Sequence, residues 1–463
     1  MGAMQTEPSC SRRRGARFPA GAWALVLLLG MPAVRAGAQS DEASLSLSGA
    51  LRAAGSHSLA ADRAALQVKT AMEGVKQARS SYFPLVSLTG GLYERDHEVV
   101  ARFGTLSAPT TNKGYWSFEA SVREVLWDFG RRSSGLRGAQ KREEAVDAAG
   151  RAAVSGAQVA ALNAYLQVLR LGERRVVVGE RVRSLQDHLR VAQNLYKEGV
   201  VARNDLLETE VRLRDVQDQA AQLADQQEVA RRSLNRLLGR DPGAGLDLPS
   251  HLPPPPPLRV SDETLQARAL DGNPEVMALQ RKLAAEKEAV ALRQGDRKPV
   301  LFAEAMHTYQ KNDYLVYDNA NILFLGAQWD VYDGGARDSR IREAEIATEL
   351  TTRDLTEAKR RVAIEVDQAL RAYRQALREA ATAGVNVKAA EENLRIVEDQ
   401  YRAGIANSTD ALDAEAVLAA SRFSLVDRHY QAYAEQAAAL SVAGEDLPTF
   451  YDTIGTRTPE KQP

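Results

Sequence analysis

The sequence predicts a mainly α-helical protein built as a twofold repeat, in which each half holds a pair of short strands and one very long helix. Alanine, leucine, glutamate, arginine and glutamine dominate most of the chain and aromatic residues make up only 6% of it, a composition typical of long helices. One group of short motifs occurs twice at a constant spacing, which indicates a duplication. A strand-like segment with alternating polarity precedes each long helical stretch.

The repeat is clearest at a turn motif near the end of each half. Tyr196-Lys197-Glu198-Gly199-Val200 recurs as Tyr401-Arg402-Ala403-Gly404-Ile405, an offset of 401 − 196 = 205 residues. The same offset relates Trp127-Asp128 to Tyr332-Asp333, and Gly130 to Gly335. Two unrelated helical segments would not keep one offset over such a distance, so we interpret the chain as a first repeat over residues 39–240 and a second over 261–445.

Each repeat is expected to contain one uninterrupted helix, over residues 131–197 and 336–402. Val182, Leu185, Leu189, Ala192 and Tyr196 follow a 3, 4, 3, 4 spacing, and the positions 205 residues later are also apolar or aromatic. This is the heptad seam of packed helices. A helix of 67 residues is about 100 Å long, so it needs antiparallel partners along its length.

Four segments of about ten residues alternate between apolar and polar side chains, as half-buried strands do. They lie at about residues 84–96 and 115–127 in the first repeat, and at about 299–309 and 322–332 in the second, with polar loops over 95–114 and 310–321. Ten residues is the length that a tilted strand needs to cross a bilayer, and four aromatic residues near the strand ends could form an interfacial girdle: Trp116, Trp127, Trp329 and Tyr332. The alternation alone fits a half-buried hairpin of a soluble protein equally well.

The N-terminus reads as a secretory signal peptide over residues 1–38, with an arginine-rich start, an apolar stretch from Ala20 to Leu29 and the small-residue site Ala36-Gly37-Ala38. Cys10, the one cysteine, falls within it. No later apolar run approaches the roughly 20 residues of a transmembrane helix, so insertion into a membrane would require a closed barrel. The connector over residues 241–260 contains five consecutive prolines and is expected to be a stiff external strap. Residues 446–463 are expected to be a polar tail.

The two turns that end the long helices carry candidate functional residues. Gly199 and Gly404 suit the left-handed position after a helix C-cap, and Asp205 and Asp410 open the helices that follow. Capping boxes would explain both aspartates, whereas Asp413 fits that account less well. If several copies of the chain converged here, these carboxylates would instead form a ring that selects cations.

The signal peptide, the doubled order of strands, long helix, turn and helix, the W/Y-D-x-G element after each second strand and the Tyr-x-x-Gly turns together resemble the TolC family of outer-membrane efflux proteins. The resemblance covers roughly Leu45 to Ala443. It implies a homotrimer in the cell outer membrane, whose four strands per subunit close a 12-stranded barrel that a periplasmic α-helical tunnel continues. It implies a passive exit duct of a tripartite efflux or type I secretion system, which works with an inner-membrane transporter and a periplasmic adaptor protein, and which contacts outer-membrane lipid.

The resemblance also assigns roles to residues of the turns. Asp410 and Asp413 match the pore constriction, and Asp205 and Tyr401 match the latch that closes the periplasmic entrance. The family's latch arginine is replaced here by Ala406, and Arg203 is a candidate for the missing cation. The adaptor-contacting tips would be Gly199, Val200, Val201, Gly404, Ile405 and Ala406.

Other functional classes find little support. The 60 Lys and Arg residues nearly balance the 61 Asp and Glu residues, so no basic surface indicates nucleic-acid binding. The six histidines are scattered, and no metal-ligand spacing, nucleophile elbow or phosphate-binding loop occurs, so we expect no enzyme, cofactor or metal site; His188, beside Asp187, is interpreted as a solvated side chain. The main alternative is a soluble periplasmic coiled-coil adaptor or scaffold without a barrel, for which one helical hairpin rather than two equal repeats would be expected.

Overall fold

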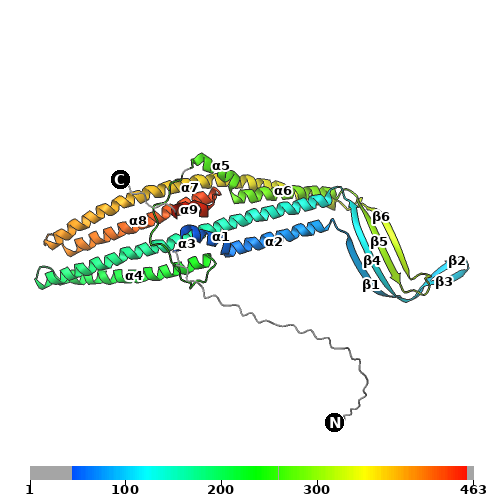
Figure 1. Ribbon diagram of the computed structural model, residues 1–463, viewed down its shortest axis with the longest axis horizontal. Helices are drawn as coiled ribbons and strands as arrows, with labels where there is room; N and C mark the ends of the chain where they lie inside the picture. Colours follow the sequence, from blue (N-terminus) through cyan, green and yellow to red (C-terminus); the bar gives the residue numbers. More distant parts are fainter. Residues whose placement is uncertain (1–43, 259, 456–463) are drawn as a thin grey trace, which may run out of the picture. The chain divides into compact units, whose positions relative to one another are not determined.

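The computed structural model describes residues 44–258 and 260–455, and the expected signal peptide lies outside them. Figure 1 shows the order of elements. The first repeat comprises α1 (Leu47–His57), α2 (Leu59–Ser80), β1 (Leu85–Glu94), β2 (Val99–Phe103), β3 (Leu106–Thr111), β4 (Gly114–Trp127), α3 (Arg131–Lys197) and α4 (Arg203–Leu237). The second comprises α5 (Asp262–Gly272), α6 (Pro274–Gly295), β5 (Val300–Gln310), β6 (Asn319–Gln328), α7 (Ala336–Arg402) and α8 (Ser408–Val442), followed by α9 (Leu447–Gly455). The mainly helical twofold repeat predicted from the sequence is confirmed.

The two long helices, α3 and α7, each contain 67 residues and span the ranges expected from the sequence. One shorter helix cannot cover such a length, because the 22 residues of α2 or α6 and the 35 of α4 or α8 reach only about 33 and 52 Å. Two shorter helices therefore pack against each long one: α2 and α4 on α3, and α6 and α8 on α7 (Figure 1). Helices α6 and α8 also contact α3, so they join the two repeats.

The four longest strands form one antiparallel sheet in the order β1-β4-β5-β6. Among the described residues, both outer strands, β1 and β6, have one edge without a partner strand. Partners in the register point to the same side of the sheet, and one side carries exposed apolar residues: Val86, Leu88, Leu92, Trp116, Phe118, Val122, Leu301, Leu323 and Leu325. The other side of β1 and β4 is polar, and Ser87 and Ser121 share a hydrogen bond of 2.7 Å there.

Two details of the strands differ from the sequence prediction. β6 ends at Gln328 rather than near residue 332, since its partner β5 begins after Pro299, which has no N–H to extend the ladder. The loop expected over 95–114 instead contains the hairpin of β2 and β3. β-Branched residues such as Val99 and Thr111 favour strands there, and Gly104 supplies the positive φ of 65° at its turn.

A central core lies where α1, α3, α4, α8 and α9 meet. Its largest fully buried side chains include Leu51, Leu162, Tyr165, Tyr433 and Leu447. The expected polar tail after residue 445 is therefore corrected in part, because Leu447 and Tyr451 place α9 in this core. The apolar stretch of α3 lies here too. Among the described residues, α3 is the one helix that is long and apolar enough to cross a membrane by length and composition alone. The 18-residue window that meets this test has a mean hydropathy of 1.2 and is 33% buried.

The proline-rich connector runs mostly at the surface, as an external strap would, and is also anchored in this core. Leu246 and Leu252 are buried. Prolines lack an N–H but keep a carbonyl that needs a donor when buried, and the Tyr433 hydroxyl donates to the Pro253 carbonyl at 2.6 Å. Tyr373 likewise donates to the Pro256 carbonyl at 3.3 Å. Helices α7 and α8 thus fix the connector through its own backbone.

Candidate functional site

The two turns at the ends of the long helices have the same backbone structure. Gly199 and Gly404 adopt φ values of 75° and 73°, the left-handed conformation expected from the sequence. In the first turn the Gly199 N–H donates to the Tyr196 carbonyl at 3.0 Å and the Val200 N–H to the Leu195 carbonyl at 2.9 Å. This is the Schellman arrangement, and Gly404 and Ile405 repeat it.

Asp205 and Asp410 cap the helices that follow these turns. The Asn407 side chain accepts from the Asp410 N–H at 2.8 Å, and the Asp410 carboxylate accepts from the Asn407 N–H at 3.1 Å. These two bonds form a complete capping box. Asp205 makes only half of one, because Ala202 donates its N–H at 3.3 Å but has no side-chain acceptor. Both carboxylates therefore have a structural partner within the chain.

A cluster of side chains joins the two helical hairpins close to the turns. The rings of His188 on α3 and Tyr401 on α7 lie 4.7 Å apart between centroids. His188 Nε2 is 3.1 Å from the Ser408 hydroxyl, which lies 3.5 Å from the Thr209 hydroxyl. Burial lowers the pKa of His188. Burial also raises the pKa of Tyr401, whose hydroxyl lies close to Ser408 and is affected by the charge of Asp205.

A half-buried ion pair forms a second link between the hairpins. Arg181 Nε on α3 donates to Glu415 Oε2 on α8 at 2.9 Å, and the two side chains are only 18% and 9% exposed. Burial raises the pKa of Glu415, and the charge and hydrogen bond of Arg181 act against that rise. On the same face, Arg422 of α8 contacts Glu180 at 2.7 Å and Glu391 at 2.9 Å.

Most of the remaining residues predicted at the turns face solvent. Asp413, Asp410 and Arg203 are exposed, and no described residue forms an ion pair or hydrogen bond with the Arg203 side chain. Val200 and Ile405 are 58% and 78% exposed, whereas Val201 and Ala406 are half-buried.

Tyr196, the repeat equivalent of Tyr401, is 42% exposed although Tyr401 is 4% exposed. The repeats differ because α8 lies between α3 and α7, while α4 covers only α3 along its length.

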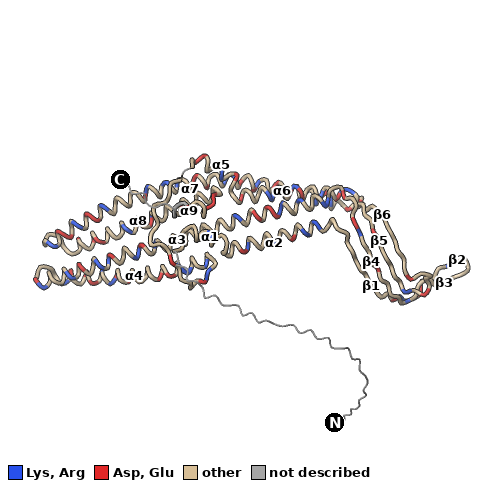
Figure 2. The backbone as a smooth tube through the Cα atoms, in the orientation of Figure 1, with Lys and Arg blue, Asp and Glu red and all other residues tan. Residues whose placement is uncertain are grey.

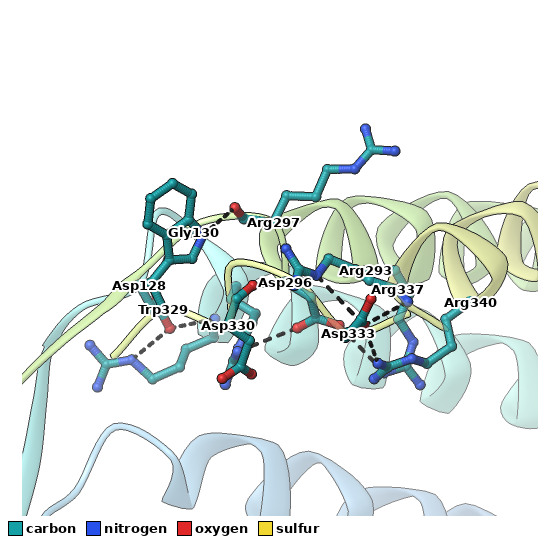
Figure 3. Close-up of polar contacts among 12 residues, drawn as sticks. Asp128, Gly130, Arg293, Asp296, Arg297, Trp329, Asp330, Asp333, Arg337 and Arg340 are labelled. Atoms are coloured by element: carbon teal, nitrogen blue, oxygen red, sulfur yellow. Dashed lines mark hydrogen bonds and ion pairs between the residues drawn. The ribbon is translucent and has the colours of Figure 1, made fainter. Parts of the chain in front are cut away.

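The W/Y-D-x-G element proves to be the N-cap of each long helix (Figure 3). Asp128 accepts from the Arg132 N–H at 2.8 Å and from its Nε at 3.0 Å, and Asp333 accepts from the Arg337 N–H at 2.8 Å. The N-cap glycines, Gly130 and Gly335, have φ values of 90° and 86°. The element therefore turns the chain from the sheet into the helix, and a carboxylate satisfies the first N–H groups.

The predicted girdle aromatics are all exposed at the ends of the sheet. Trp127, Trp329 and Tyr332 lie at the end that leads into the helices and are 58%, 56% and 88% exposed, and Trp116, toward the opposite end, is 63% exposed. The Trp329 Nε1 donates to the Arg297 carbonyl at 3.1 Å. An apolar sheet face with exposed aromatic residues toward both of its ends is the pattern of a membrane strand set.

The family model of outer membrane efflux proteins matches residues 50–240 and 265–445, one segment in each repeat. The chain belongs to the outer membrane efflux protein family. It is an efflux duct of the outer membrane. A comparison with curated protein sequences found no match.

Several solved outer-membrane proteins share the fold of this family member. The outer membrane protein VceC of Vibrio cholerae matches with a TM-score of 0.73 and 18% identity, over 86% of this chain and 96% of its own. The CmeC outer membrane channel of Campylobacter jejuni matches with a TM-score of 0.73 and 13% identity, over 96% and 98%. The open state of the MtrE outer membrane channel of Neisseria gonorrhoeae matches with a TM-score of 0.71 and 16% identity, over 87% and 89%.

Sequence reasoning missed two features of the helix tips in this efflux protein. His188 was interpreted as solvated, but the structure packs it against Tyr401; its position three residues after the buried Leu185 was the available signal. The pairing of Arg181 with Glu415 had no signal, because the two residues are 234 positions apart.

Proposed function

We propose that three copies of this chain assemble into a closed duct, in which β6 of each protomer pairs with β1 of the next. The observation that carries this proposal is the four-stranded sheet with two unpaired edges and an exposed apolar face. Lipid offers no partners for backbone N–H and C=O groups, so an open edge is not tolerated in a bilayer. Three sheets of four strands would close a 12-stranded barrel of the tilted kind that membranes accept.

The periplasmic end of this duct is proposed to lie at the turns after α3 and α7. In a trimer each turn would occur three times, so that the exposed carboxylates of Asp410 and Asp413 would form rings at the constriction. Asp205, Tyr401 and Arg203 would belong to the latch of the entrance. With Ala406 in place of the arginine that the family resemblance implies, closure would depend more on contacts within each protomer, such as that between His188 and Tyr401.

The exposed turn residues support a contact with a periplasmic adaptor. Val200 and Ile405 present apolar side chains to solvent beside glycines that lack any side chain, which suits docking of another helical hairpin. The inner-membrane transporter would supply the energy, because a passive duct performs no chemistry. That transporter would also select the cargo, so the duct could serve either a tripartite efflux system or a type I secretion system.

The soluble adaptor alternative is not favoured. A soluble periplasmic protein would leave the apolar sheet face in water. On that face Leu88, Leu323 and Leu325 are 69%, 76% and 69% exposed. Monomeric soluble proteins rarely expose so continuous an apolar surface. The family match over both repeats agrees with the duct.

The assembly can be tested by fractionation of cells that express the full chain. We expect the protein in the outer membrane as a trimer that resists SDS until it is boiled. Release by osmotic shock, or a monomer under all conditions, would contradict the trimeric duct.

The latch can be tested on the assembled protein in planar bilayers. Asp205→Ala and Tyr401→Phe should raise single-channel conductance, because the Asp205 carboxylate and the Tyr401 hydroxyl are the groups proposed to hold the entrance closed in the assembled trimer. Arg402→Gln serves as the control, because the Arg402 side chain is 63% exposed and pairs only within α7, with Glu398 and Asp399. If the latch variants and the control both conduct like the wild type, the latch assignment is wrong.

A further inference from the structure

Two adjacent cations, Arg297 and Lys298, lie where the apolar face of the sheet meets the helices. They occupy the turn between α6, which ends at Gly295, and β5, which begins at Val300. Both side chains are exposed, and Figure 3 shows the Arg297 side chain extending away from the ribbon. Figure 2 shows that Lys and Arg are frequent where α3, α6 and α7 meet the strands.

The register places the Leu301 side chain, three residues after Lys298, on the apolar side of the sheet. Leu301 of β5 pairs with Trp127 of β4 and with Ala327 of β6, so these three side chains share the apolar face. Trp329 continues that face beyond β6 and donates its indole N–H to the Arg297 carbonyl at 3.1 Å. Arg297 is thus held directly beside an exposed membrane-side aromatic residue.

Phe129 links Lys298 to the same group of aromatic residues. The Lys298 Nζ lies 5.5 Å from the centroid of the Phe129 ring, and the Phe129 and Trp127 rings meet edge to face at 6.0 Å. Lys298 has no carboxylate partner among the described residues and lies at the edge of the apolar face.

The backbone of Phe129 is strained. Its φ of 54° makes it the one described non-glycine residue with a positive φ, a conformation that disfavours bulky side chains by about 1–2 kcal/mol. The equivalent position of the second repeat, 129 + 205 = 334, holds Gly334, with a φ of 69°. Strain of this kind persists where the side chain serves a function.

Three carboxylates of this region are turned inward, whereas Asp330 and Asp338 are exposed. The side chains of Asp128, Asp296 and Asp333 are only 8%, 21% and 25% exposed, and Asp128 and Asp333 cap helices. Arg297 is 57% exposed and contacts one exposed carboxylate, Asp338, at 2.7 Å. This end of the apolar face therefore presents the Lys298 ammonium, unpaired among the described residues, beside exposed aromatic rings.

We propose that Arg297 and Lys298 bind the phosphate of an anionic phospholipid in the periplasm-facing leaflet of the outer membrane, with Trp127, Phe129 and Trp329 against its glycerol and upper acyl chains. This deepens the proposed function, on which it rests for the membrane position of the sheet. Lys and Arg side chains extend to the headgroup level from an apolar surface, and aromatic residues prefer the same level. Charge complementarity selects an anionic headgroup over a zwitterionic one.

Native mass spectrometry of the detergent-purified full chain, titrated with phosphatidylglycerol or phosphatidylcholine of matched acyl chains, tests this. Wild type should retain phosphatidylglycerol preferentially. Arg297→Gln with Lys298→Gln should weaken that binding by about fivefold per cation, and Asp338→Asn should strengthen it by releasing Arg297. Arg353→Gln with Arg360→Gln, which changes two side chains of α7 that are 79% and 73% exposed, should leave the preference intact.

Phe129→Gly separates the lipid site from stability. It should weaken phosphatidylglycerol binding without lowering the thermal stability of the protein, since glycine accepts the backbone conformation without strain. Equal retention of both lipids by wild type, or an unchanged preference in the double glutamine variant, would overturn the proposal. So would displacement of the lipid by inorganic phosphate, which would identify a phosphate site.

Trimer formation and conductance are read separately in the same samples. A wild type that forms trimers and conducts but shows no lipid preference would refute the lipid site alone, whereas a wild type that forms no trimer would refute the duct.

Discussion

The ion pair between Arg181 and Glu415 gives the sharpest test of how the helical hairpins are held together. Arg181→Gln leaves the Glu415 carboxylate, whose side chain is 9% exposed, without its cation. Breaking a fully buried pair costs about 3–5 kcal/mol and breaking an exposed one about 0.2–1 kcal/mol. Since Arg181 is 18% exposed, we expect a local destabilisation between these limits, about 2 kcal/mol.

Hydrogen exchange of the amides around Glu415 measures this change. A loss of about 2 kcal/mol raises their exchange rate about 30-fold if they exchange by local opening. Arg190→Gln is the matched control, because Arg190 lies on the same helix, is 73% exposed and pairs only with Asp187; its exchange rates should equal those of wild type. Arg181→Leu with Glu415→Leu should recover most of the loss, because an apolar pair has no charge to bury.

The pH dependence of the same variant follows from the pKa of Glu415. Burial raises that pKa above its ordinary value of 4.5, so the protonated form is favoured in the folded state. Below 4.5 the carboxyl is neutral whether folded or unfolded, and Arg181→Gln should then have little effect. The destabilisation should appear as the pH rises through the raised pKa. The reasoning is refuted if the amide exchange rates around Glu415 in Arg181→Gln are within twofold of wild type at pH 7.5. It is also refuted if the difference from wild type is larger at pH 4 than at pH 7.5.

Three further predictions concern other parts of the fold. Burial lowers the pKa of His188 below 6.5, so its contact is stable above that pH and lost as the pH falls through the lowered pKa; conductance should rise in acid, and His188→Gln should abolish the dependence. Gly239→Ala should lower the melting temperature far more than Gly199→Ala, because the new Cβ at Gly239 would lie 2.0 Å from the His57 carbonyl oxygen, whereas nothing lies within 4 Å at Gly199. Gly199→Ala should cost only the backbone strain of a left-handed alanine, about 1–2 kcal/mol. Similar melting temperatures for the two variants would contradict this. Tyr433→Phe removes a donor to the connector and should lower the stability by about 1 kcal/mol, with faster exchange confined to the neighbours of the connector; a change spread over the whole chain would argue against that anchor.

The helix tips show why one half of a repeat predicts the other only in part. The motif around Gly199 and Gly404 recurs with the same backbone hydrogen bonds, because turn chemistry depends on a few consecutive residues. The burial of Tyr196 and Tyr401 differs, because it depends on which helix packs alongside. No spacing within one repeat contains that information.

The strands show the same division. The alternation of apolar and polar residues predicted four strands. β6 ends at Gln328 because Pro299, before its partner β5, has no N–H to extend the ladder. The hairpin of β2 and β3 was hidden because its residues lie in a polar, glycine-containing stretch. The anchoring of the connector was equally hidden, since the tyrosines that donate to its carbonyls lie more than a hundred residues away.

The duplication, the length of the long helices, the caps that begin and end them and the strand pair in each repeat can all be read from the amino-acid sequence. These features depend on residues close together in the chain, where hydrogen bonding and periodicity act directly. Only the packing of the elements shows that α8 lies between α3 and α7, that His188 meets Tyr401, and that Lys298 lies over Phe129. Such contacts join residues far apart in sequence, and their energies come from shared burial and paired charge, which exist only once the elements have packed.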